Sequence, residues 1–288
     1  MRKLRGLVVA TVTPMYDDGS IDLDSFRGHL RDLLDNGVEG LFVAGTTGEG
    51  LFLSPGEQEL LVRTAVEFTA GRAAVVGHCA ALGTESVVTL TRRLHHAGAD
   101  GVAALTPFYY KVDANAMIEH FRRVADAAEC PTYLYSIPGA TGVDLPVSVV
   151  ESLARHPHFG GVKYSNHDME GLRRYIETGV DVFIGCDPLI TEAMRQGAAG
   201  TVSGPAGCLP AIHAALFRRL RDGTDPSAAQ AKVTYVDSVL ARLPAVAGYK
   251  TVLQKRGVIA SAAVRRPLRG LGPEEQRQLA GALEEVRA

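Results

Sequence analysis

The sequence of 288 residues contains no run of about 18 uncharged apolar residues, so no membrane-spanning helix is expected. Neither sign of charge predominates, since 30 basic residues stand against 32 acidic ones and the formal net charge is −2. A protein that binds the phosphate backbone of nucleic acids would carry a basic surface, and this balance weighs against one. The hydrophobic fraction of 46% is sufficient for a folded core. The composition predicts a soluble globular protein with neither a nucleic-acid nor a membrane partner.

Cysteine is scarce, and no two cysteines form a C-x-x-C pair; the four are Cys79, Cys130, Cys186 and Cys208. Their wide spacing argues against a structural zinc site, and their apolar surroundings are typical of buried, reduced thiols. The N-terminal apolar run Gly6–Val12 follows basic residues, but it ends at Pro14 without a small-residue cleavage pattern. We interpret it as a first strand rather than a signal peptide, and we expect a cytoplasmic protein.

Short apolar runs recur along the chain, and each is followed by a stretch with helical periodicity. The runs lack polar alternation, as strands of a parallel sheet buried on both faces do. Eight such units of roughly 25 to 30 residues predict a closed (β/α)8 TIM barrel, in the α/β class. An open doubly wound sheet is the alternative, but no G-x-G-x-x-G follows an early strand. The expected strands are Gly6–Val12, Gly40–Gly45, Ala74–Cys79, Gly101–Leu105, Thr132–Ser136, Gly161–Tyr164, Val182–Cys186 and Gly200–Ser203.

Two of the intervening helices carry clear boundary signals. Ser54 precedes Pro55 and Glu57, which is typical of a capped helix N-terminus. A second helix is expected to begin at Thr84 and to end at Gly98, where glycine can adopt the left-handed conformation.

The chain continues for about sixty residues after the eighth unit, which ends near Arg221. We therefore divide it into a barrel, residues 1–222, and a C-terminal helical extension, residues 223–288. An extension of this kind usually packs on the barrel or builds an oligomer interface. Its expected helices are Ala228–Leu243, Gly248–Arg256 and Pro273–Arg287.

In a barrel, functional groups gather at the carboxyl ends of the strands, and Lys163 and Tyr135 lie at two such ends. The chain has only six lysines against 24 arginines, so a lysine within an apolar strand is unusual. A low-dielectric barrel mouth disfavours the ammonium form of Lys163 and frees its amine as a nucleophile. The alternatives are a snorkelling surface lysine or an ion-pair partner. Tyr135 could shuttle protons, or it could be a core aromatic with a satisfied hydroxyl.

The loop Gly45–Glu49 combines flanking glycines with the adjacent hydroxyls of Thr46 and Thr47. Exposed backbone N–H groups and two hydroxyls can hold a carboxylate, although many βα loops look similar. Asp187 ends the seventh strand. It could accept hydrogen bonds from substrate hydroxyls, or it could cap the next helix with Pro188 as the first helical residue.

His78 ends the third strand and allows a metal-dependent alternative together with Asp187. A metal site would need two or three further ligands, and the other histidines that we considered lie in helical or loop stretches. We therefore expect neither a metal nor an organic cofactor. The segment Ser203–Gly207 is a weak phosphate-binding signal, because Pro205 removes one backbone donor.

These residues, in this order, resemble the pyruvate-dependent class I lyase family, which includes dihydrodipicolinate synthase, N-acetylneuraminate lyase and 2-keto-3-deoxygluconate aldolase. The resemblance covers most of the chain and implies a (β/α)8 barrel. Near the C-terminus, two motifs are similar to the lyase branch. The motifs are Gly45–Glu49, Thr106–Tyr110, Tyr135-x-x-Pro138, Thr141-Gly142, Gly161–Lys163, Gly185-x-Asp187, Lys250–Leu253 and Arg266–Leu268.

The resemblance implies that Lys163 forms an imine with pyruvate, whose carboxylate is held by Thr46 and Thr47. Tyr135 would be the proton shuttle, linked through Thr46 to Tyr109. In the family that last tyrosine enters the neighbouring subunit's site, which implies a homo-oligomer, a dimer of tight dimers. The substrate-binding residues implied besides Thr47 are Gly48, Ser165, Gly185, Asp187, Ser203 and Gly204.

Departures from the family pattern narrow the second substrate. Ala140 stands where dihydrodipicolinate synthase has an arginine for the aspartate-semialdehyde carboxylate, and losing that pair disfavours this activity by about 1.5–3 kcal/mol. Pro188 and Gly204 replace a Glu and a Ser that contact the sugar tail in N-acetylneuraminate lyase. Ser136, where the family usually has Asn, and Tyr164 are further departures without an assigned role.

The leading hypothesis is a class I aldolase that cleaves or forms a 2-keto-3-deoxy sugar acid, or a related 2-oxo acid, from pyruvate and an aldehyde. Alternatives within the resemblance are N-acetylneuraminate lyase, 4-hydroxy-tetrahydrodipicolinate synthase and a sugar-acid dehydratase. A non-catalytic barrel is the alternative from another class.

Overall fold

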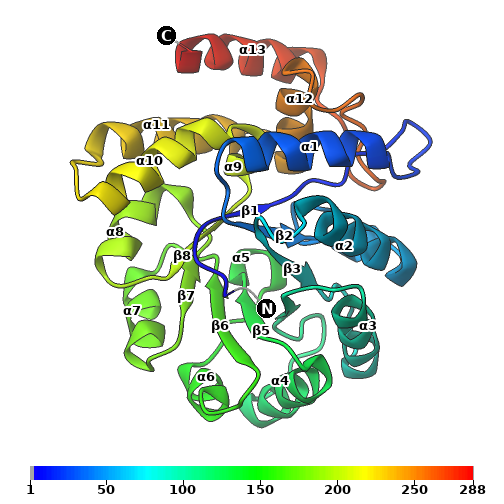
Figure 1. Ribbon diagram of the computed structural model, residues 1–288, viewed down its shortest axis with the longest axis vertical. Coiled ribbons are helices and arrows are strands. Elements are labelled where there is room, and N and C mark those ends of the chain that lie inside the picture. Colours follow the sequence, from blue (N-terminus) through cyan, green and yellow to red (C-terminus); the bar gives the residue numbers. More distant parts are fainter. Residues whose placement is uncertain (1–2, 288) are drawn as a thin grey trace.

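A closed barrel of eight parallel strands forms the centre of the computed structural model, which describes residues 3–287 (Figure 1). Each strand pairs with its neighbours in sequence, and β1 closes the barrel by pairing with β8. The predicted fold class and all eight strands are confirmed. The strands are β1 Gly6–Ala10, β2 Gly40–Val43, β3 Ala74–His78, β4 Gly101–Leu105, β5 Thr132–Ser136, β6 Phe159–Tyr164, β7 Val182–Ile184 and β8 Gly200–Ser203.

Helices surround the barrel, and the two predicted boundary signals are confirmed. Ser54 and Glu57 form a reciprocal capping box at the start of α2, and α3 ends just before Gly98, which has φ +93°. The main helices are α1 Leu23–Asp35, α2 Pro55–Thr69, α3 Thr84–His96, α4 Ala114–Ala128, α6 Val147–Leu153, α7 Met169–Glu177, α8 Ile190–Arg195 and α10 Pro210–Asp222. Short helices follow four strands: η1 Gly50–Phe52, α5 Pro138–Thr141, η2 Asp187–Leu189 and α9 Pro205–Cys208.

Alternate residues of each strand face two different cores. Phe42, Tyr135 and Phe183 belong to the cluster inside the barrel, whereas the cluster between strands and helices contains the residues of opposite phase. Tyr164 is in the outer cluster, with its ring centroid 5.2 Å from that of Tyr175. Because Lys163 precedes Tyr164, its side chain has the opposite phase and faces inward. The departure at Tyr164 therefore concerns the helix layer and not the barrel mouth.

The C-terminal extension comprises α11 Ser227–Leu240, α12 Ala245–Lys255 and α13 Pro273–Arg287, and it lies beside α10 and α1 (Figure 1). A third apolar cluster joins Val12 and Cys208 of the barrel to Val252 and Leu253 of α12. The extension and the barrel thus share a core. None of the helices in the described part of the chain is long and apolar enough to cross a membrane.

Candidate active site at the barrel mouth

Lys163 projects into the barrel from β6, next to Tyr135 of β5 in the strand register. Its side chain is buried, with 5% of the residue exposed. The Nζ atom lies 3.6 Å from the centroid of the Tyr135 ring and 4.9 Å from that of Phe42. Among residues 3–287, no carboxylate forms an ion pair with this amine. The snorkelling and ion-pair alternatives for Lys163 are therefore wrong.

The hydroxyl groups of Tyr135 and Thr46 connect the barrel interior with the surface. The Tyr135 hydroxyl lies 3.2 Å from Thr46 Oγ1, and either atom can donate. Tyr135 is 1% exposed, whereas Thr46 is exposed at the mouth. The ring of Tyr135 thus contacts the lysine, and its hydroxyl can exchange a proton with the solvent-exposed hydroxyl of Thr46.

Within one molecule, Tyr109 does not join the hydroxyl groups of Tyr135 and Thr46. It lies in the loop after β4, it is 82% exposed, and its ring contacts that of Tyr110 edge-on at 5.1 Å. Its φ is +76°, a left-handed conformation that a tyrosine adopts only at a cost on the order of 1 kcal/mol. The insertion of Tyr109 into a second subunit stays a prediction.

The loop after β2 is held by the C-terminal extension. Glu49 has φ +59° and forms an ion pair with Lys250 of α12, Oε1 to Nζ 2.5 Å, and both side chains are completely buried. Its other oxygen accepts a hydrogen bond from the backbone N–H of Arg265 at 2.6 Å. The sequence analysis missed this pair, although Glu49 and Lys250 both stood within recognised motifs. The hydroxyls of Thr46 and Thr47 are therefore positioned from outside the barrel.

Close packing explains the glycines of the expected substrate site. A Cβ at Gly48 would lie 3.0 Å from the carbonyl oxygen of Thr11. A Cβ at Gly185 would lie 2.0 Å from Ser165 Oγ, so only glycine lets the ends of β6 and β7 approach so closely. Ser165 and Gly185 are thus adjacent and half-buried at the mouth.

Asp187 lies in a buried polar cluster. Its Oδ2 accepts hydrogen bonds from Ser203 Oγ at 2.6 Å and from His213 Nε2 at 2.7 Å. Ser203 and His213 are fully buried, and the Ser203 hydroxyl also accepts from the Ala206 N–H at 2.9 Å. Ser203 thus supports Asp187, and its hydroxyl is already bonded on both sides. Asp187 Oδ1 is buried and has no hydrogen-bond partner within residues 3–287.

The helix-cap alternative for Asp187 is wrong. Asp187 is itself the first residue of η2, the residue before it is Cys186, and no side chain caps this helix. The carboxylate is instead oriented toward His213 of α10. Nothing in the sequence distinguished His213 from the other helical histidines. Asp187 follows β7, whereas His213 lies in α10, which follows β8.

Asp237 of α11 is half-buried and has a shifted pKa. Burial, with a smaller effect of Asp187, raises its pKa to about 6, whereas His167 and His213 oppose the shift. The folded protein thus holds this proton more tightly than the unfolded chain, whose ordinary value is 3.8. Stability therefore falls as the pH rises from about 4 to about 6 and stays lower above that range.

Replacing Asp237 by Asn should remove this penalty. Asp237 is partly exposed, so we expect the free energy of unfolding at about pH 8 to rise by only about 1 kcal/mol. The difference between the two proteins should vanish below about pH 4, where the carboxyl is protonated in both states. Urea unfolding of both proteins at the two pH values measures this. An equal gain in the free energy of unfolding at both pH values would show that the charge of Asp237 is not the cause.

His78 lies among aromatic rings. Its ring centroid is 5.7 Å from that of Phe42 and 5.6 Å from that of Tyr135, and Nδ1 is 3.2 Å from the Ala44 carbonyl oxygen. Burial lowers its pKa to about 4, which keeps the imidazole neutral. Within the described chain, no three His, Cys, Asp or Glu side chains gather as metal ligands would.

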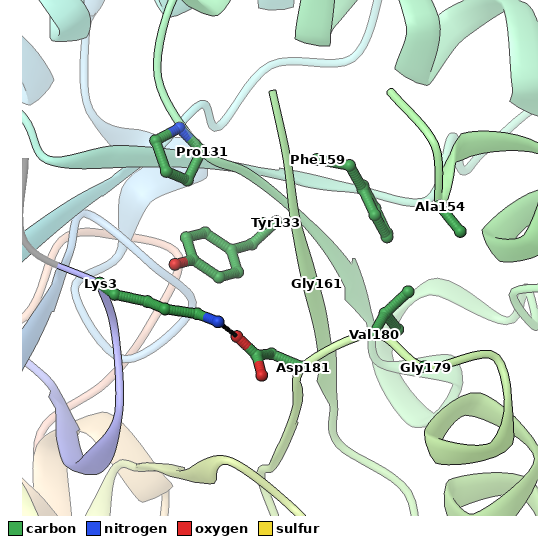
Figure 2. A pocket seen from close by; sticks show the side chains of 10 residues that line it. Lys3, Pro131, Tyr133, Ala154, Phe159, Gly161, Gly179, Val180 and Asp181 are labelled. Atoms are coloured by element: carbon green, nitrogen blue, oxygen red, sulfur yellow. Dashed lines mark ion pairs between the residues drawn. The ribbon is translucent and has the colours of Figure 1, made fainter. Parts of the chain in front are cut away.

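A hollow of about 390 Å³ lies at the opposite end of the barrel, around Tyr133, Gly161 and Asp181 (Figure 2). Lys3 reaches across it and forms an ion pair with Asp181 at 2.9 Å, as Figure 2 shows. This is the amino end of the strands, where barrel residues serve stability, whereas catalytic groups lie at the carboxyl ends. The candidate active site is therefore the mouth around Lys163.

The fold and this site define a (β/α)8 barrel protein with an unpaired lysine, a tyrosine and a threonine at its mouth. The family model described as Dihydrodipicolinate synthetase family matches residues 3–286, and the chain belongs to this family.

The chain is similar to lyases and synthases of several organisms. An uncharacterized DapA-like lyase of Halobacterium salinarum is 35% identical over 98% of this chain and 94% of the relative. The 4-hydroxy-tetrahydrodipicolinate synthase 1 of Streptomyces coelicolor is 34% identical over 97% of this chain and 93% of its own length. Among solved structures, YagE of E. coli K12 is a prophage protein of the dihydrodipicolinic acid synthase family, solved in complex with pyruvate. It superimposes with a TM-score of 0.94 at 26% identity, covering 99% of each chain.

Proposed function

We propose that the protein is a pyruvate-dependent class I aldolase in which Lys163 forms a Schiff base. The observation that carries the proposal is the amine of Lys163, which is buried, faces the Tyr135 ring at 3.6 Å and lacks a carboxylate partner within residues 3–287. An amine in this setting can attack a ketone. The similarity to YagE, a structure in complex with pyruvate, supports the choice of ketone.

The residues at the mouth suit each step of this chemistry. Lys163 Nζ adds to the ketone carbon of pyruvate, and the carbinolamine then loses water to give a protonated imine. Tyr135 supplies and removes the protons, which it exchanges with Thr46 at 3.2 Å. The imine draws electrons from C3, so an enamine forms and adds to an aldehyde, or the reverse reaction releases pyruvate. Thr46 and Thr47 would hold the pyruvate carboxylate.

A second subunit would complete the proton path. Tyr109 is exposed and strained in one chain, and we propose that it contacts the Tyr135–Thr46 pair of a neighbouring copy. The family resemblance suggests a dimer of tight dimers. Equilibrium sedimentation reports this association directly.

The second substrate is proposed to be an aldehyde without a carboxylate, so the favoured reaction is cleavage or formation of a 2-keto-3-deoxy sugar acid. Ala140 lies exposed in α5, just after β5, which carries Tyr135. Its side chain offers no charge to a carboxylate on the second substrate. Synthesis of 4-hydroxy-tetrahydrodipicolinate is the second candidate, because several relatives carry that name. N-acetylneuraminate cleavage and sugar-acid dehydration are further alternatives. A dehydratase would leave the carbon chain intact, so a coupled assay for released pyruvate separates it from an aldolase.

Borohydride reduction in the presence of pyruvate tests the Schiff base. We expect a reduced pyruvyl adduct on the peptide that carries Lys163, since reduction makes the imine irreversible. Peptide mass mapping locates it, and omission of pyruvate is the control. An adduct on a different lysine, or none, would refute the proposal.

A further inference from the structure

The C-terminal extension places at the barrel mouth a hydroxyl that the proposed mechanism does not use. Tyr249 of α12 lies against Gly204, where an added Cβ would be 3.2 Å from Tyr249 Cε2 and 3.3 Å from its hydroxyl. The same position is 3.1 Å from Thr47 Oγ1, so both hydroxyls border one small space. Within residues 3–287, no hydrogen bond engages the Tyr249 hydroxyl. It is free to bind a ligand.

The carboxylate of Asp187 lies beside this space, because its Oδ2 accepts a hydrogen bond from Ser203, the residue before Gly204. Burial raises the pKa of the Tyr249 phenol, which stays a neutral donor. Asp187 Oδ1 is buried and unpartnered, whereas Oδ2 is bonded to His213 and Ser203. A buried acceptor without a partner is costly unless a ligand satisfies it.

This cluster adjoins the reactive lysine. Lys163 of β6 pairs in register with Phe183 of β7, and Asp187 follows the end of that strand. This side of the mouth therefore combines the hydroxyl of Tyr249 with the buried carboxylate of Asp187.

We infer that Tyr249 of the C-terminal extension, together with the unpartnered Oδ1 of Asp187, selects the aldehyde by hydrogen bonds to its hydroxyl groups and discriminates against an aldehyde with an anionic tail. The inference rests on the proposed function and deepens it. A neutral polyhydroxylated tail satisfies the Tyr249 donor and the nearby carboxylate acceptor. A phosphate on the same tail would be repelled by the carboxylate of Asp187.

The experiment compares cleavage of 2-keto-3-deoxygluconate with cleavage of its 6-phosphate. We expect kcat/KM of the unmodified protein to favour the uncharged acid by about a hundredfold. Tyr249→Phe should lower kcat/KM for the uncharged acid about tenfold, as loss of one hydrogen bond does, with borohydride trapping of pyruvate unchanged. Tyr235→Phe makes the same change at an exposed tyrosine of α11 and is the matched control. It should alter neither kcat/KM nor pyruvate trapping.

The outcomes separate this inference from the proposed function. Absence of a pyruvate adduct on Lys163 would refute both. An adduct combined with preference for the phosphorylated acid, or with no cleavage of either acid, would overturn the inference alone. So would a Tyr249→Phe protein that loses pyruvate trapping, because its hydroxyl would then serve the pyruvate carboxylate.

Discussion

Replacement of Lys163 by Ala is expected to remove both the pyruvate adduct and all turnover. The buried amine is the only nucleophile of the protein that the proposed mechanism uses, and no carboxylate in the described chain depends on it for charge balance. The fold should therefore persist while the chemistry is lost. Pyruvate release from a 2-keto-3-deoxy acid, together with circular dichroism, measures the two properties.

Two further variants define what this loss means. Lys232→Ala removes an exposed lysine from α11 and should leave both adduct and turnover intact. Tyr135→Phe should still permit imine formation but slow cleavage by about 10²- to 10⁴-fold, as expected when a proton shuttle is removed. Residual turnover in Lys163→Ala above the uncatalysed rate would show that another group carries the reaction.

Replacement of Lys250 by Met should destabilise the protein severely. The change leaves the carboxylate of Glu49 completely buried without its partner at 2.5 Å, and it also removes the hydrogen bond from Lys250 Nζ to the Ala263 carbonyl at 2.6 Å. Breaking one side of a buried ion pair lowers the free energy of unfolding by about 3–5 kcal/mol. Urea denaturation measures this loss.

The double variant Glu49→Gln with Lys250→Met is the control for that prediction. Because it buries no uncompensated charge, it should recover a large part of the lost stability. If the double variant were as unstable as Lys250→Met alone, shape rather than charge would be responsible. We also expect the single variant to bind pyruvate poorly, since Glu49 closes the loop that carries Thr46 and Thr47.

The barrel could be predicted from sequence because each strand is buried on both faces. Such a strand is a short run of apolar residues that needs no knowledge of its partners. Lys163 could be singled out for the same reason, as a charged residue inside one of those runs. The order of the strand ends then placed Tyr135 beside it, which the register of β5 and β6 confirms.

The contacts that sequence reasoning missed all join elements far apart along the chain. Glu49 meets Lys250, Asp187 meets His213, and Tyr249 packs on Gly204. Each depends on how α10 and α12 return to the barrel mouth, and neither periodicity nor boundary signals encode that path. The hydrogen bonds of Ser203 to Asp187 and to the Ala206 amide could not be predicted for a related reason, because they depend on how α9 follows β8.

The bond between Glu49 and the extension has a consequence for biosynthesis. All eight strands leave the ribosome before Lys250 and Arg265 are added, so the threonine loop of a nascent barrel lacks the two groups that hold Glu49. The loop can therefore bind an anion only after the C-terminal residues have been translated. A prematurely terminated chain would retain Lys163 and yet be unable to present its substrate to it.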